Sequence, residues 1–151
     1  MTTPVNSATI LRDTLFAVKN FLSGAVPDII TNRPTNESFF LTAYPSKPTT
    51  FPIITIKDIN TYDEAWLGLQ SEAMKHIIDM EVRVWADNVP QRDKLTDSIQ
   101  NAMRTNIYGG GSSWSQDYDL HDCRLLSSIN VDNADGPKSK VLTYRFMYIA
   151  T

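Results

Sequence analysis

The feature that most constrains the fold is a run of strict alternation between apolar and polar side chains in the middle of the chain. Between His76 and Ala86, the apolar positions are Ile78, Met80, Val82, Val84 and Ala86, and they alternate with Asp79, Glu81, Arg83 and Trp85. A period of two places the first set on one face of a strand and the second set on the other. The run therefore predicts a β-strand that is buried on one face, as is typical of antiparallel sheets.

Two other segments show the three- and four-residue spacing of amphipathic helices. The first is predicted to begin after Ser7 as its N-cap and to end near Gly24, with Pro27 following. Its apolar stripe comprises Ile10, Leu11, Leu15, Val18, Phe21 and Leu22. The second is predicted to begin at Asp87-Asn88-Val89-Pro90 and to end near Asn106. Its buried stripe comprises Leu95, Ile99, Ala102 and Met103, and its predicted solvent-facing residues are Arg92, Lys94, Asp97, Gln100 and Arg104.

The remaining strands are predicted at residues 38–43, 52–59, 120–131 and 139–150, and a long connecting excursion is predicted at residues 58–75. The order of elements is then α-β-β-β-α-β-β. This order predicts an α+β fold: a two-layer sandwich with a mostly antiparallel sheet of about five strands and two amphipathic helices. At 151 residues the chain is the size of one domain, and we expect a single domain over residues 1–151.

Composition limits the classes of function. The net charge is −3, which argues against a dedicated nucleic-acid binder, because such proteins usually carry a basic face. The single cysteine, Cys123, cannot form an intramolecular disulfide or a cysteine-based zinc site, and we expect it to be a small buried side chain on a strand. The first residues resemble no signal peptide, and no apolar run has the ~18 residues of a membrane span. We expect a soluble protein that is made and used in a cytoplasm.

The sequence contains no recognisable catalytic, cofactor-binding or metal-binding motif. Its two histidines, His76 and His121, belong to no metal or nucleophile pattern. The run of three glycines at 109–111 is not followed by the Lys-Ser or Lys-Thr of a phosphate-binding loop. A metal-dependent nuclease remains an alternative built on Asp58, Asp63, Asp79 and Glu81. That alternative conflicts with Arg83, which stands where such enzymes usually place a catalytic lysine.

Interaction residues are instead predicted from exposed aromatics and from long connections. Trp85 lies on the polar face of its strand, where an aromatic indicates a subunit interface or a covered face. The 58–75 excursion and the glycine-rich 107–118 segment are the other candidates. The predicted interaction residues are Tyr62, Trp66, Leu67, Trp85, Tyr108, Gly109, Gly110, Gly111 and Trp114.

One stretch of strand and helix carries a family resemblance. The strand Met80-Glu81-Val82-Arg83-Val84-Trp85-Ala86-Asp87 leads into the charged helix that begins Val89-Pro90-Gln91-Arg92-Asp93-Lys94-Leu95. In this pattern, in the N-terminal helix, in the strand at 51–56 and in the closing strand at 144–148, the chain resembles tail terminator (tail completion) proteins of long-tailed bacteriophages. The likeness covers most of the chain as a pattern of elements, without an invariant motif.

The resemblance implies a structural protein with no active site and no cofactor. Its copies would form a ring, usually of six, that caps the tail tube at the head-proximal end of the virion tail. Implied partners are other copies of the chain, the tail tube protein and the head-tail connector or stopper protein, with DNA passing through the ring without specific binding. The alternatives are another neck, connector or minor tail protein, a small metal-dependent nuclease or hydrolase, and a module that binds peptides along a sheet edge.

Overall fold

A computed structural model of the protein describes residues 6, 8–64, 74–108, 120–132 and 136–150. The seven elements occur in the predicted order of helices and strands. Their bounds are α1 (Ile10–Ala25), β1 (Phe40–Leu41), β2 (Ile53–Glu64), β3 (Met74–Ala86), α2 (Val89–Tyr108), β4 (His121–Asp132) and β5 (Lys138–Ala150).

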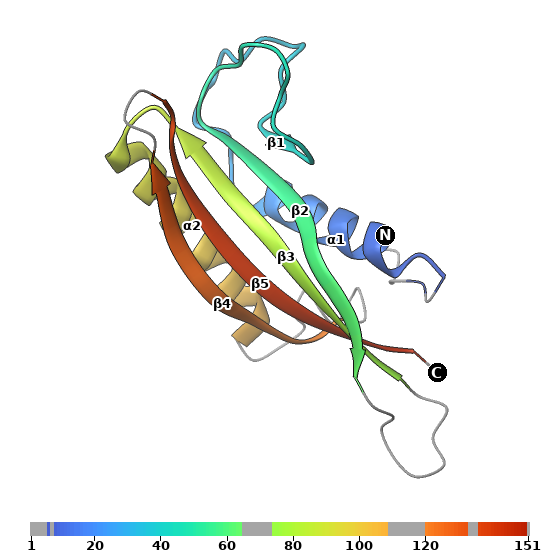
Figure 1. The fold of residues 1–151 in the computed structure, drawn as a ribbon. Coiled ribbons are helices and arrows are strands. Elements are labelled where there is room, and N and C mark those ends of the chain that lie inside the picture. Colours follow the sequence, from blue (N-terminus) through green and yellow to red (C-terminus); the bar gives the residue numbers. More distant parts are fainter. Residues whose placement is uncertain (1–5, 7, 65–73, 109–119, 133–135, 151) are drawn as a thin grey trace.

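The strands form one sheet with the order β1-β2-β3-β5-β4. The short β1 runs parallel to β2, and the other neighbouring strands are antiparallel. Both helices cover the same face of the sheet (Figure 1). We call the opposite side the open face. The predicted α+β fold, with two helices and a mostly antiparallel five-stranded sheet, is confirmed.

The core lies between the helices and the sheet, and the alternation in β3 determines which side chains enter it. The five apolar positions predicted from Ile78 to Ala86 are all 0% exposed. Strand β5 contributes a matching set, because Phe146 lies opposite Ile78 and Leu142 lies opposite Val82. Helices α1 and α2 supply the other half of the core. Their buried apolar residues are Ala17, Val18, Leu22, Leu95, Ile99 and Met103.

The start of α2 confirms the predicted Asx cap. The side-chain oxygen of Asn88 accepts a hydrogen bond from the backbone N–H of Gln91 at 2.9 Å. In return, the Gln91 side chain accepts one from the backbone N–H of Asp87 at 3.2 Å. This reciprocal pair satisfies donors that the first helical turn leaves free, as in a capping box. The cap sets where the chain leaves β3 and turns onto the sheet.

The predicted start of α1 is wrong, whereas its predicted end near Gly24 is within one residue of the observed end. The N-cap is Thr9, not Ser7, and the helix continues through Gly24 to Ala25. The carboxylate of Asp13 accepts hydrogen bonds from the Thr9 hydroxyl at 2.6 Å and from the backbone N–H of Asn6 at 3.0 Å. The Asp13 side chain, inside the first turn, therefore accepts the hydrogen bonds that fix this end of the helix. An N-cap residue before the helix is the usual sequence signal, and Asp13 does not give that signal.

Two predictions about the β2 region are also corrected. The strand expected at 38–43 is only the pair Phe40–Leu41, and the prolines that follow it cannot donate to a ladder. Conversely, residues 58–64 and 74–75, expected to be part of a connecting excursion, continue β2 and β3 as a long hairpin. A register shift between Asp58 and Asn60 leaves Ile59 as an extra residue, and pairing resumes beyond it. Polar side chains hide this strand from a pattern search.

Candidate functional site

The open face carries two ion pairs between neighbouring strands. The guanidinium of Arg145 donates to both carboxylate oxygens of Asp79, at 2.8 and 3.0 Å. The ammonium of Lys57 lies 3.4 Å from the Glu81 carboxylate. Asp79 and Glu81 are 7% and 9% exposed, so the prediction that β3 is buried on only one face is corrected. Each carboxylate is bound by a cation of the protein, and such charge-assisted pairs fix the strand faces relative to one another.

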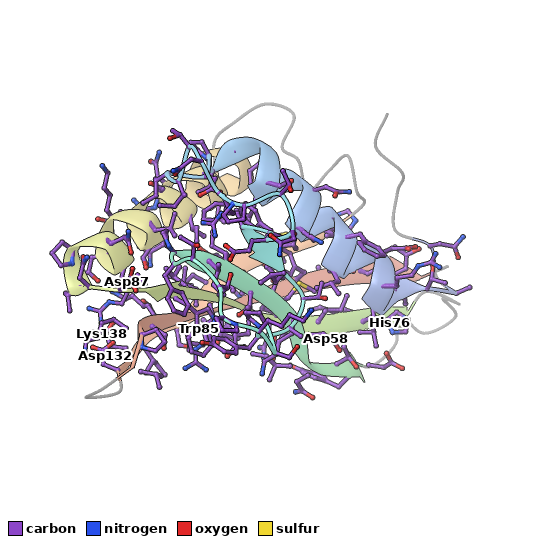
Figure 2. All side chains as sticks on the ribbon, turned by 90° about the horizontal axis from the view of Figure 1, so that it is seen from above. Asp58, His76, Trp85, Asp87, Asp132 and Lys138 are labelled. Carbon is purple, nitrogen blue, oxygen red and sulfur yellow. The ribbon has the colours of Figure 1, made fainter. Side chains whose placement is uncertain are left out.

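Trp85 has partners within its own chain. Its indole N–H donates to the Thr55 hydroxyl at 3.0 Å, and the Arg83 guanidinium lies 3.9 Å from the ring centroid. Tyr44, from the segment after β1, packs at a centroid distance of 4.6 Å. Figure 2 places Trp85 on the side of the sheet away from α1. The structure therefore uses this aromatic to attach a connecting segment to the open face.

Tyr62 lies near the free end of β2 and is 38% exposed. The Arg145 guanidinium lies 5.7 Å from its ring centroid. Tyr62 also lines a shallow pocket of about 210 Å³ together with Ile10 and Leu11 of α1. In this pocket the His76 imidazole contacts the Asp63 carboxylate across the β2–β3 hairpin. The described residues contain no group of three or more His, Cys, Asp or Glu that could hold a metal ion.

Several predicted interaction residues lie outside the part of the chain that the structure describes. These residues are Trp66, Leu67, Gly109, Gly110, Gly111 and Trp114. Tyr108 is the last residue of α2. Tyr62 and Trp85 are thus the two predicted residues whose side chains have a described geometry, and they lie on neighbouring strands of the open face.

Strand β4 carries exposed apolar side chains at the edge of the sheet that were not predicted from the sequence. It lies at the end of the strand order, and β5 is the one described strand that pairs with it. Four of its large apolar side chains are 39 to 56% exposed. We call this set the edge patch: Leu125, Leu126, Ile129 and Val131. Ile129 and Val131 lie on the open face, whereas Leu125 pairs with Tyr144 and lies on the helix-covered face. The sequence feature that could have indicated an unprotected edge strand is the absence of Lys and Pro from residues 121–132, because these residues often protect an edge strand from pairing.

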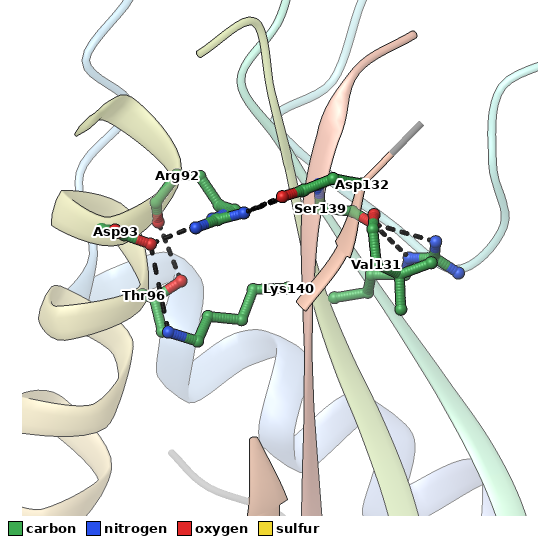
Figure 3. Close-up of polar contacts among 8 residues, drawn as sticks. Arg92, Asp93, Thr96, Val131, Asp132, Ser139 and Lys140 are labelled. Atoms are coloured by element: carbon green, nitrogen blue, oxygen red, sulfur yellow. Dashed lines mark hydrogen bonds and ion pairs between the residues drawn. The ribbon is translucent and has the colours of Figure 1, made fainter. Parts of the chain in front are cut away.

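A polar network fixes the β4–β5 hairpin against α2 (Figure 3). Arg92 of α2, predicted to face solvent, is only 4% exposed, so that prediction is wrong. Its guanidinium donates to both carboxylate oxygens of Asp132, each at 2.7 Å, and to Asp93 at 3.0 Å. The backbone N–H of Ser139 donates to Asp132 at 3.2 Å. The edge patch is therefore carried by a hairpin held in place from the helix side.

The network continues through the sheet to the open face. The fully buried Ser139 hydroxyl donates to the carbonyl oxygen of Val131 at 2.5 Å and accepts a hydrogen bond from Arg83 at 2.9 Å. Because Arg83 stacks on Trp85, this set of contacts connects α2, both strands of the β4–β5 hairpin and the open face. Satisfied polar networks of this kind favour one arrangement of the strands.

We expect the network to make the stability of the fold depend on pH. Hydrogen bonds from Arg92 hold the pKa of Asp132 below its ordinary value of 3.8, and the same contacts raise the pKa of Arg92. A carboxylate whose folded pKa is lowered stabilises the fold above its unfolded pKa, and this contribution is lost as the pH falls through the folded pKa. We therefore expect Asp132→Asn to be less stable than the wild type at pH 7 and the difference to narrow below about pH 3.8.

Urea unfolding between pH 7 and pH 3 measures this difference. Asp97→Asn, on the exposed side of α2, is the matched control and should stay within about 0.5 kcal/mol of the wild type at each pH. A difference between Asp132→Asn and the wild type that is independent of pH would contradict the role given to the carboxylate charge.

Comparison with protein-family models finds no match to this chain, and comparison with curated proteins also finds none. Among the described helices, none is long and apolar enough to cross a membrane.

Proposed function

We propose that the chain is a structural virion protein whose copies form a ring on the end of a tail tube. In that role it ends tube polymerisation and provides the surface to which the head is joined. The observation that carries the proposal is the edge patch. Exposed apolar side chains on an edge strand mark a surface that another chain covers, because the unpaired backbone groups of the edge add hydrogen bonds to the apolar burial.

A ring is the natural product of such a surface when its partner is a second copy. Repetition of one head-to-tail contact generates a ring when the rotation closes. The fold supplies the rigidity that this requires, because Arg92 and Ser139 hold the hairpin that carries the patch. Capping a tube requires binding and no catalysis. One face of the ring binds the tube end as a tube subunit would, and the other face does not accept a further subunit.

The choice of a tail tube as partner rests on the resemblance described above. The stretch that carries it occupies β3 and α2, whose junction contains the reciprocal Asn88–Gln91 cap. The net charge of −3 is compatible with DNA passing through the ring without specific binding. Another neck, connector or minor tail protein would share the ring and differ in its partner.

The experiment is light scattering of the purified protein across concentration, alone and with preformed tail tubes, followed by electron microscopy of the tube ends. We expect either a defined ring or a single chain that assembles into a ring on tube ends, together with tubes that stop growing. A single chain that ignores tubes at every concentration would overturn the proposal. A peptide-dependent change in such a monomer would identify a peptide-binding module instead.

A further inference from the structure

Exposed apolar side chains gather on the two outer long strands of the sheet. On β4 they form the edge patch, and on β2 they are Ile59 and Tyr62, which are 52% and 38% exposed. These strands lie on opposite sides of the β3–β5 centre. One chain therefore carries exposed apolar side chains at two separate edges of the sheet, and neither edge covers the other.

The outer edge of β2 is also open beyond its short pairing with β1. Strand β1 pairs with β2 only at Ile54 and Thr55, so no described strand pairs with the outer edge from Ile56 to Glu64. Side chains from Lys57 to Asp63 are all exposed. Backbone N–H and C=O groups along such an edge form a template for an additional strand.

The directions of the strands allow the β4 edge of one copy to pair antiparallel with the β2 edge of another. Strands β3 and β4 are both antiparallel to β5 and so run the same way, whereas β2 runs against β3. If two copies are placed side by side with their open faces on the same side, β4 of one runs antiparallel to β2 of the other. Antiparallel pairing is the more stable of the two arrangements per residue.

We propose that β4 of one copy pairs antiparallel with the outer edge of β2 in the next copy, which joins their sheets into one. This inference rests on the proposed ring and names its subunit contact. The contact is heterologous: it uses two different surfaces, and every copy added to a chain of subunits leaves one of each free until the ring closes. Pairing of β4 with β4 would instead produce a two-fold dimer with no edge patch left to continue.

A charge placed in the edge patch tests the contact. Ile129 is 56% exposed, so Ile129→Lys should leave the folded monomer intact while placing an ammonium group on the open face beside the joined strands. The control is Phe16→Lys, the same kind of change at a 47% exposed position on α1. With tail tubes present, we expect Ile129→Lys to require at least about tenfold more protein to assemble, and Phe16→Lys to behave as the wild type. Equal thermal unfolding of the two variants confirms that both are folded.

Cross-linking tests which edges meet. Cys123 is 4% exposed and is replaced by alanine, after which Ser128→Cys on β4 and Thr61→Cys on β2 are made in separate proteins. Both positions are exposed and lie on the helix-covered face, because Ser128 pairs with Leu142 and Thr61 pairs with Ile78. A flexible bis-maleimide reaching about 10 Å tolerates a shift of about three residues along a strand. We expect a cross-linked pair only when the two variants are mixed. A product from Ser128→Cys alone would show β4–β4 pairing and overturn the inference, as would assembly without any cross-link.

The two proposals fail in different ways. A wild-type protein that never assembles, with or without tubes, overturns the ring and the contact together. A wild-type ring that Ile129→Lys forms at the same protein concentration overturns the contact and leaves the ring standing.

Discussion

Replacing Arg92 with methionine should lower the free energy of unfolding by about 2 kcal/mol, because the change leaves the carboxylates of Asp93 and Asp132 without their main partner. Methionine retains an unbranched apolar stem in place of the aliphatic part of arginine, so the loss reports the charge and its hydrogen bonds more than the packing of the stem. Removing one member of a fully buried ion pair usually costs about 3–5 kcal/mol. Here the cost is smaller, since the Asp132 side chain is 34% exposed and water can solvate it.

Urea unfolding at pH 7 measures this loss. Lys94→Met is the matched control, because Lys94 lies two residues away on the exposed side of α2, and it should change stability by less than about 0.5 kcal/mol. The double variant Arg92→Met with Asp132→Asn should lose less than the sum of the two single losses, since the residues act as a pair. Strict additivity would show that the Arg92–Asp132 contact contributes nothing.

Replacing Phe146 with alanine should lower the free energy of unfolding by about 4 kcal/mol. Phe146 is 0% exposed and lies in β5 opposite Ile78, between the sheet and the helices. Truncation removes the burial of an aromatic ring and leaves a cavity that the surrounding strands and helices cannot fully close. Because natural domains are stable by only about 5–15 kcal/mol, this variant should unfold at a clearly lower temperature and urea concentration.

The neighbouring residue provides the control for this prediction. Met147 is next in the chain, but it is half-buried and belongs to the open face, so Met147→Ala should cost about 1 kcal/mol or less. Thermal unfolding followed by circular dichroism distinguishes the two variants. Equal losses from both would contradict the assignment of one face of β5 to the core.

The buried network and the exposed edges belong to one arrangement. Ion pairs on the open face and the Arg92–Asp132 pair fix the strands and the hairpin, while the apolar side chains of the edge patch remain outside the core. A monomer whose strands are already fixed by these contacts loses little conformational freedom when it assembles through its exposed edges. Preorganisation of this kind suits a subunit that repeats one contact around a ring.

The sequence alone was sufficient to predict a helix or strand and its buried face where the spacing of apolar residues within that element is regular. The alternation from Ile78 to Ala86 predicted both the strand and its buried face, and the spacing of Leu95, Ile99 and Met103 predicted the buried side of α2. The Asn88 cap was predicted from a local signal and is confirmed by its hydrogen bond to Gln91. Each of these features depends on neighbours along the chain, so the fold class followed from them.

Tertiary structure decided what depends on residues far apart in the chain. Arg92 is a charged residue of the kind that usually faces solvent. It is buried because the fold places the carboxylate of Asp132, forty residues away in the chain, within hydrogen-bonding distance of its guanidinium. The polar end of β2 forms a strand because its backbone is hydrogen-bonded to β3. The same pairing places the Tyr62 ring beside the Arg145 guanidinium. β4 is an edge because β5 enters the sheet between β3 and β4. Sequence spacing predicts the faces of a strand, but only strand order decides which strand is left with an open edge.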